Sequence, residues 1–274
     1  MNTQEYMSFV LPLKAVFIEC LGANDEVLCV ASGFIYKQGD EFYLCTCWHV
    51  VTGYNPGDLK VKSPPDRKAI MMYWQDVRLK RHKSTHTGRQ SLRIELYDNS
   101  TAPPTPLWMQ DDAATQHPDL SAINIRVPGL LDLVMLRLPD DIKVSDAQYI
   151  DETEKFSDFM LMLGQKVFLV GYPYGYSTLG RSQPMPVVLT RFVAANMIEK
   201  TLATALLDGA GAGGMSGCPV FIEKNDTIVL AGIYTGSIYP DHIIQKNNPV
   251  TALGKISVLG IMFSPKTVKS GMPT

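Results

Sequence analysis

The sequence lacks an excess of charge of either sign, and it lacks a long apolar run. Its 274 residues carry 25 Lys and Arg against 27 Asp and Glu, which gives a net charge of −2. That balance offers no footprint for bulk binding to nucleic acid or to an acidic membrane surface. No run approaches the ~20 apolar residues of a membrane span. We therefore expect neither a nucleic-acid partner nor membrane insertion.

Cysteine is also scarce. Five cysteines, an odd and scattered set, are too few for a disulfide framework. The first residues, MNTQEYMSFVLPLKAVFIE, have no basic region ahead of their apolar part, which Lys14 and Glu19 interrupt, so they do not resemble a signal peptide. Without an export signal, we expect a cytoplasmic protein whose cysteines are reduced thiols.

Many short β-rich runs, separated by Gly, Pro, Asn and Asp, fill the chain. This pattern predicts an all-β sandwich or barrel and not a βαβ repeat. A stretch at Asp151–Met162 separates two sets of runs and is one of two candidates for short helix; the other is a single turn near His49. We therefore predict two domains, residues 1–150 and 151–274. The runs include AVFIEC, EVLCVASGFIY, EFYLCTCW, LRIELYD, LDLVMLRL, QKVFLVGYP, PVVLTRFVAA, TIVLAGIYTG and SVLGIMF.

Two segments, Lys60–Arg89 and Asn99–Pro118, are expected to be long loops. The first contains the basic run RLKRHK, but no aromatic residues alternate with its charges, so a solvated loop is favoured over a nucleic-acid surface. His82 and His86 have the spacing of a metal pair on a helix. The threonines and glycine around them disfavour a helix, and no third ligand is near. We expect no metal and no cofactor.

The segment DGAGAGGMSGCPVF (Asp208–Phe221) is the most informative. It formally matches a dinucleotide-binding fingerprint, which requires a helix after the glycines. Pro219 and its β-branched and aromatic neighbours predict a strand there instead. A tight Gly-rich loop can aim backbone N–H groups at one point beside an exposed serine. Ser216 is therefore a candidate nucleophile, with the amides of Gly214 and Ser216 as an oxyanion hole. The same residues would also suit a plain Gly-rich turn without a catalytic role.

A serine nucleophile needs a base and a carboxylate that orients the base. His49 ends the apolar run YLCTCWHVV, and strand ends commonly present catalytic residues. Asp132 opens the apolar run DLVMLRL, where an unpaired carboxylate would be costly to bury. Asp119, in PDLSAINI, has the same local pattern, so the residues themselves leave both aspartates open.

The segments YLCTCWHVV, LDLVMLRL and GGMSGCPVF, in the order His, Asp, Ser, resemble the trypsin-like (chymotrypsin-fold) serine peptidases, above all the bacterial trypsin-like peptidase domains. The resemblance implies two six-stranded antiparallel β-barrels with the active site between them. It also implies a catalytic triad of His49, Asp132 and Ser216 in an endopeptidase. Asp132 is preferred because His117–Pro118 resembles a family feature upstream of the triad aspartate.

The same resemblance predicts where substrate binds. GIYTGS resembles the strand that pairs with the substrate backbone beside the specificity pocket, which makes Thr235 and Gly236 substrate-binding candidates. Ala210 lies where trypsin keeps the aspartate at the base of its pocket. Cleavage after Arg or Lys is therefore not expected, and a small or apolar side chain is predicted at the cleavage position.

Departures from the family pattern keep two other functions open. Cys47 and Trp48 replace the small residues that usually precede the histidine, and Cys218 follows the Ser-Gly pair. The first alternative is a catalytically silent trypsin-fold module that binds peptides or a protein. The second is an esterase, although the strand–elbow–helix context of the α/β-hydrolases is missing around Ser216. The predicted partner is a peptide or protein substrate, and the oligomeric state stays open.

Overall fold

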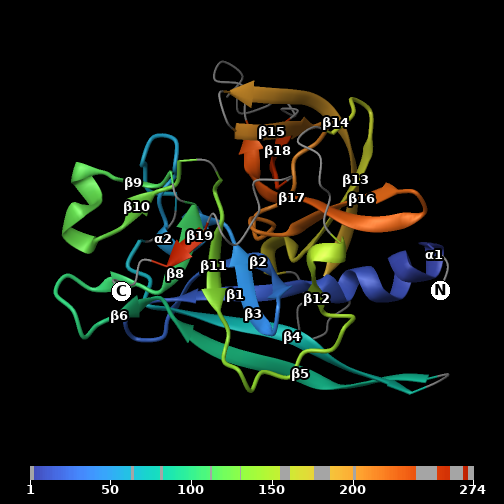
Figure 1. Ribbon diagram of the computed structural model, residues 1–274, viewed down its shortest axis with the longest axis horizontal. Coiled ribbons are helices and arrows are strands. Elements are labelled where there is room, and N and C mark those ends of the chain that lie inside the picture. The colour runs from blue at the N-terminus through green and yellow to red at the C-terminus, as the bar shows by residue number, and fades with distance from the viewer. Residues whose placement is uncertain are drawn as a thin grey trace.

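The computed structural model describes residues 3–62, 65–80, 83–111, 113–129, 131–154, 161–175, 186–199, 202–238, 252–259 and 268–270. Strands dominate them and form one large sheet and one closed barrel (Figure 1). The predicted all-β class is confirmed. The division into domains at residue 150 stays a prediction.

The first sheet contains nine strands within the described residues. Eight follow the order β19-β8-β11-β3-β2-β1-β4-β5, and β12 pairs with β2. β19 brings a segment near the end of the chain back to this first sheet, beside β8. The strands are β1 (Ala15–Leu21), β2 (Val27–Gln38), β3 (Glu41–Thr46), β4 (Ala69–Lys80), β5 (Lys83–Glu95), β8 (Trp108–Asp111), β11 (Val134–Arg137), β12 (Tyr149–Ile150) and β19 (Val268–Ser270).

The second sheet closes on itself as a barrel of six antiparallel strands in the order β13-β14-β15-β18-β17-β16. Closure leaves no exposed sheet edge. In Figure 1 the barrel lies above the first sheet. Its strands are β13 (Lys166–Gly171), β14 (Val187–Glu199), β15 (Leu202–Leu207), β16 (Pro219–Lys224), β17 (Thr227–Ile238) and β18 (Leu253–Val258).

Helices are short, and two small strand pairs complete the fold. The helical turns are α1 (Thr3–Glu5), η1 (Tyr6–Val10), η2 (Leu11–Lys14), α2 (Trp48–Thr52), η3 (Pro118–Ile123), η4 (Glu152–Glu154) and η5 (Pro173–Gly175), and the strand pairs are β6 (Tyr97–Asp98) with β7 (Thr105–Pro106) and β9 (Thr115–Gln116) with β10 (Arg126–Val127). Within the described residues, no helix is long and apolar enough to cross a membrane.

Two hydrophobic cores explain why barrel strands such as β13 are apolar at nearly every position. Successive side chains of a strand point to opposite faces. Val167 and Leu169 of β13 lie in the core of the barrel, whereas Phe168 and Val170 lie in the core of the first sheet. Each face of β13 therefore meets an apolar core, so the two sheets are joined by a continuous hydrophobic interface.

The segment expected to be a long loop at residues 60–89 was predicted wrongly over much of its length. β4 and β5 form an antiparallel hairpin that pairs from Ala69↔Glu95 to Lys80↔Lys83, and it extends to the lower right in Figure 1. β4 opens with the apolar run AIMMYW, but the charged run RLKRHK that follows favoured a solvated loop. At Asp151–Met162 the structure has a single turn, η4; residues 155–160 lie outside the described residues.

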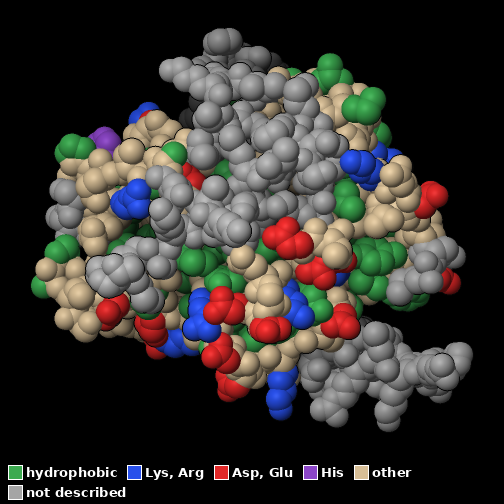
Figure 2. Space-filling view, viewed as in Figure 1, with side chains coloured by type: hydrophobic (Ala, Val, Ile, Leu, Met, Phe, Trp, Pro, Cys, Tyr) green, Lys and Arg blue, Asp and Glu red, His purple; other side chains and the backbone are tan. Residues whose placement is uncertain are grey.

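Acidic and basic side chains lie next to one another on the described part of the face in Figure 2. Arg137, for example, is 2.8 Å from Glu41 and 3.0 Å from Asp140. This mixing accords with the near-neutral charge of the whole chain.

Ser32 of β2 joins the first sheet to the barrel. Its backbone N–H donates to the carbonyl of Ser216 at 2.9 Å. Its hydroxyl donates to the carbonyl of Gly214 at 2.7 Å and accepts from the N–H of Tyr172 at 2.9 Å. Ser32 is fully buried, so water cannot replace these partners, and the segment that carries Ser216 is fixed against β2.

We expect Ser32→Ala to lower the free energy of unfolding by about 1–3 kcal/mol, because it removes the hydroxyl that bonds to the carbonyl of Gly214 and to the N–H of Tyr172. Urea denaturation measures this. Ser8→Ala is the matched control, since the hydroxyl of Ser8 bonds to the nearby carbonyl of Gln4 in an exposed turn; its effect should stay within about 0.5 kcal/mol. Equal losses in the two variants would contradict the proposed junction.

Candidate active site

His49 lies in α2, the predicted single turn. Trp48 beside it is fully buried, and its indole N–H donates to the carbonyl of Arg126 at 3.0 Å. The carbonyl of His49 accepts from the N–H of Gly53 and from Nη1 of Arg67, both at 3.0 Å. The unexpected tryptophan therefore anchors the turn, and the backbone of His49 is held from several sides.

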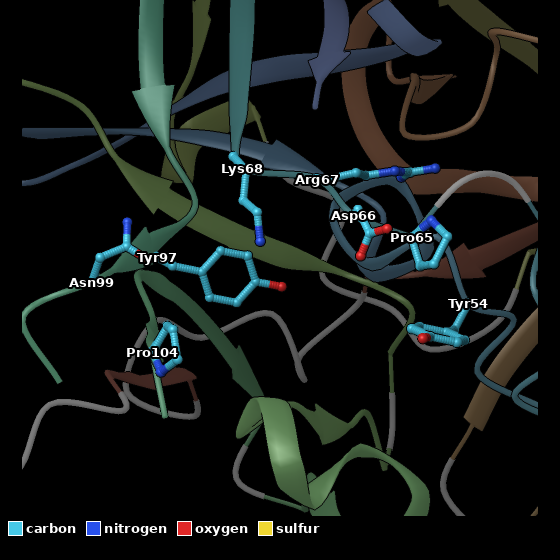
Figure 3. A pocket seen from close by; sticks show the side chains of 8 residues that line it. All are labelled: Tyr54, Pro65, Asp66, Arg67, Lys68, Tyr97, Asn99 and Pro104. Carbon is cyan, nitrogen blue, oxygen red and sulfur yellow. The ribbon is translucent and has the colours of Figure 1, made fainter. Parts of the chain in front are cut away.

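A cavity of about 140 Å³ lies next to Arg67 (Figure 3). Nζ of Lys68 is 5.9 Å from the centre of the Tyr97 ring. The guanidinium of Arg67 points away from Tyr97 in this view and bonds to the backbone of His49. The lining residues include neither His49 nor Ser216. The cavity therefore lies beside Arg67, which holds the backbone of His49, and does not include the candidate catalytic side chains. They are Tyr54, Pro65, Asp66, Arg67, Lys68, Tyr97, Asn99 and Pro104.

His49 and Asp132 form a close pair. Nδ1 of His49 is 2.6 Å from Oδ2 of Asp132, and the backbone N–H of His49 donates to Oδ1 at 3.1 Å. Each side chain is only 8% exposed. Burial by itself would raise the pKa of the Asp132 carboxyl, but the neighbouring His49 and its hydrogen bonds outweigh burial and hold that pKa below its ordinary value. An ionised Asp132 fixes Nδ1 as the donor, which leaves Nε2 as an acceptor.

Asp119, the other candidate, lies elsewhere. Its carboxylate is 3.7 Å from Nδ1 of His117, and both side chains are well exposed. Among the aspartates considered, the structure thus brings Asp132 and not Asp119 to His49. His82 and His242 lie outside the described residues.

The loop that carries Ser216 is fixed by a long-range backbone hydrogen bond and by a tight turn. The carbonyl of Gly213 accepts from the N–H of Tyr174, and the carbonyl of Met215 accepts from the N–H of Cys218 at 3.0 Å. In a trans peptide the N–H points opposite to the C=O. The amides of Gly214 and Ser216 therefore point away from these partners, and within the described residues neither donates to an acceptor.

Two glycines in this loop have backbone conformations that other residues rarely adopt. Gly214 and Gly217 both have φ near +87°. A Cβ at Gly214 would lie 2.5 Å from the carbonyl oxygen of Tyr172. A Cβ at Gly217 would collide with the carbonyl oxygen of Ser32 and the hydroxyl of Thr46. The loop thus needs glycine at positions 214 and 217, both because φ is positive there and because no room is left for a Cβ.

One carbonyl group connects the serine loop to the segment that carries His49. The oxygen of Tyr234 accepts from the N–H of Gly217 at 2.9 Å and from the thiol of Cys47 at 3.4 Å. Ser216 and His49 each lie within two residues of these donors. Within the described residues, no hydrogen bond joins the Ser216 hydroxyl to the His49 imidazole; such bonds often tighten only when substrate binds.

Cys47, His49 and Asp132 bring their ligand atoms within 4.8 Å of one another, a spacing that a metal ion could use. Zinc needs a thiolate. Burial raises the pKa of the Cys47 thiol well above its ordinary value, and the nearby Asp132 raises it further. The residues therefore fit a hydrogen-bonded His–Asp pair with a neutral thiol beside it better than they fit a metal centre.

No protein-family model matches the chain, and no curated protein matches it. Solved structures do. A human heparin binding protein has a TM-score of 0.51 at 11% identity, over 96% of each chain. Rv3671c protease from M. tuberculosis, in its active form, has 0.48 at 12%, over 98% of this chain and 86% of that one. The thermostable serine protease AL20, from an extremophilic microorganism, has 0.47 at 10%, over 91% and 92%.

This chain has the trypsin-like fold. At 11% identity the likeness to the human protein establishes the architecture alone, so the function rests on the residues of the site. The expected fold class is confirmed. Its six-stranded closure is seen in the barrel, while the first sheet follows an open order of strands in the described residues.

The predicted substrate-binding residues of this trypsin-like fold lie around the serine loop. Thr235 is buried, and its hydroxyl donates to the carbonyl of Lys255 at 3.2 Å. Gly236, at an irregularity in the pairing of β17 with β18, has φ of +137°. The carbonyl of Ala210 accepts from the guanidinium of Arg191 at 3.0 Å. Their roles toward substrate stay predictions.

Sequence reasoning missed three residues that shape the site: Ser32, Arg67 and Tyr234. Ser32 does carry a signal, because it is a polar residue in the apolar run VASGFIY, and a buried hydroxyl needs partners. Arg67 stands in a polar segment, and Tyr234 stands among other apolar residues of β17. Their partners are far away in the sequence, so no local pattern reveals them.

We predict that Gly217→Ala lowers the free energy of unfolding by about 3 kcal/mol or more, since unfavourable φ and steric collision add. Gly39→Ala is the matched control. Gly39 also has a positive φ of +56° but no atom within 4 Å of an added Cβ, so only about 1–2 kcal/mol should be lost. Denaturant unfolding of both variants gives the comparison, and equal losses would refute the close approach of Gly217 to β2.

Proposed function

We propose that this protein is a serine endopeptidase in which His49, Asp132 and Ser216 act as a catalytic triad. The contact of 2.6 Å between Nδ1 of His49 and Asp132 carries the proposal. It gives the imidazole the orientation and tautomer of a general base, with Nε2 as the proton acceptor. Burial of an unpaired carboxylate would cost free energy. The pairing of Asp132 with His49 offsets this cost and orients the imidazole.

In the proposed reaction, Oγ of Ser216 attacks the carbonyl carbon of a peptide bond while Nε2 of His49 takes its proton. The C=O oxygen becomes an oxyanion, to which the amides of Gly214 and Ser216 donate. His49 then gives the proton to the leaving amine, and the C–N bond breaks to leave an acyl-enzyme. Water, activated by His49, hydrolyses the ester and restores Ser216.

Two features support the oxyanion hole. Both amides lack an acceptor within the described residues, and the two positive-φ glycines flank Ser216. Thr235 and Gly236 would pair with the substrate backbone, and Ala210 would contribute to the pocket. The substrate would be a peptide or an unstructured protein segment.

The five cysteines form no disulfide, which fits the proposed location in the reducing cytoplasm.

The test combines hydrolysis of casein with labelling by a fluorophosphonate. Ser216→Ala should abolish labelling, and His49→Ala should abolish hydrolysis. Asp132→Asn should lower kcat by about 10⁴-fold because the imidazole adopts the wrong tautomer. Asp119→Asn is the matched control and should leave kcat unchanged, since Asp119 is exposed and lies beside His117. Thermal melts establish that each variant is folded.

Three outcomes would contradict the proposal. Labelling that persists in Ser216→Ala would show that the nucleophile lies elsewhere. Binding of peptides without hydrolysis would favour the silent peptide-binding module, for which the relevant observation is that no hydrogen bond joins Ser216 to His49 in the described part of the chain. Cleavage of simple esters but of no peptide would favour an esterase.

A further inference from the structure

We propose that the ring of Tyr234 fills the space beside Ser216 that would receive a substrate side chain, so that the protein cleaves after small residues such as Gly, Ala and Ser. The inference rests on the proposed function and names its substrate class. It concerns the residue whose carbonyl carbon Ser216 attacks, called here the acyl-side residue.

The backbone of Tyr234 is fixed to the chain that follows Ser216. Its carbonyl accepts from the N–H of Gly217 at 2.9 Å, and its N–H donates to the carbonyl of Cys218 at 3.0 Å. The side chain of Tyr234 therefore leaves β17 at the level of the nucleophile. It is 1% exposed, so the ring is turned inward.

The phenol oxygen of Tyr234 joins the loop before Ser216 to the end of β17. It accepts from the N–H of Gly211 at 2.7 Å, in the loop before the serine. It also lies 2.9 Å from the hydroxyl of Ser237, near the end of β17. The ring thus extends from one segment to the other, across the space between them.

A third element, β18, lies beside the ring. A Cβ at Gly254 would lie 3.3 Å from Cε2 of Tyr234, and a Cβ at Gly211 would lie 2.8 Å from its Cζ. Glycine at these two positions gives the ring the room that side chains would otherwise take. The space between the serine loop, β17 and β18 is therefore already occupied by this chain.

This space is where the acyl-side residue would place its side chain. In the proposed reaction the attacked carbonyl oxygen binds at Gly214 and Ser216, and the substrate backbone pairs along Thr235 and Gly236. A side chain on the attacked residue then projects between the serine loop and the end of β17, toward Tyr234. A hydrogen or a methyl group needs no further room, whereas Leu, Phe or Arg would have to displace a buried ring that makes two hydrogen bonds.

The test uses peptides that differ only in the acyl-side residue: Gly, Ala, Leu, Phe and Arg. For the wild-type protein we expect kcat/KM to be at least about tenfold higher with Ala than with Phe or Arg, as expected for discrimination by the size of a pocket. Tyr234→Ala should raise the Phe/Ala ratio of kcat/KM by at least about tenfold. Tyr234→Phe, the matched control, keeps the ring and should keep the preference for Ala.

A second measurement does not require hydrolysis. Removal of a large buried side chain leaves a cavity that can bind a small aromatic molecule. Indole should raise the melting temperature of Tyr234→Ala but not that of the wild type or of Tyr234→Phe. The wild-type peptide profile decides the matter even if Tyr234→Ala does not fold.

Wild-type cleavage after Phe or Arg as fast as after Ala would overturn this inference while leaving the triad intact. An unchanged Phe/Ala ratio in folded Tyr234→Ala would overturn it as well. Failure of the wild type to cleave any of the peptides, with no labelling of Ser216, would overturn the proposed function and the preference together; indole binding would then still report whether Tyr234 fills the space.

Discussion

The site depends on the hydrogen bonds of one buried serine between two sheets. Ser32 uses its N–H for the carbonyl of Ser216 and its hydroxyl for Gly214 and Tyr172, and its carbonyl accepts from Thr46 at 2.9 Å. Side chains of the two hydrophobic cores supply the energy of association, but apolar burial is non-directional. Directional bonds at Ser32 set the register of the serine loop against the sheet whose strand β3 leads into α2 and His49.

The features of the fold that were predictable from the sequence are those that a local residue pattern indicates. Strand-like apolar runs gave the all-β class, and Pro219 after the glycines correctly excluded a helix, because β16 begins there. The hairpin of β4 and β5 was missed because the charged run at its tip, RLKRHK, favoured a solvated loop. The contacts of Ser32 and Tyr234 join segments far apart in the sequence, so they follow from tertiary packing and have no local periodicity.

The fold alone does not assign a function, since one architecture supports catalysts and binding proteins alike. What distinguishes this chain is a set of polar groups that would cost free energy to keep in place if they had no function. An almost buried carboxylate bonds to a histidine at 2.6 Å, and two amides beside a serine lack an acceptor among the described residues. The filled space at Tyr234 then limits which peptides such a site would accept. Mechanism and specificity thus derive from separate contacts, which can be tested independently.

The most direct measurement of the central claim is a crystal structure of the protein after reaction with a fluorophosphonate. Our account predicts a covalent bond from Oγ of Ser216 to phosphorus. A phosphonyl oxygen should lie about 2.7–3.1 Å from the amide nitrogens of Gly214 and Ser216, and Nε2 of His49 should face the adduct. Phosphorus on another residue, or an oxygen directed away from both amides, would contradict the account.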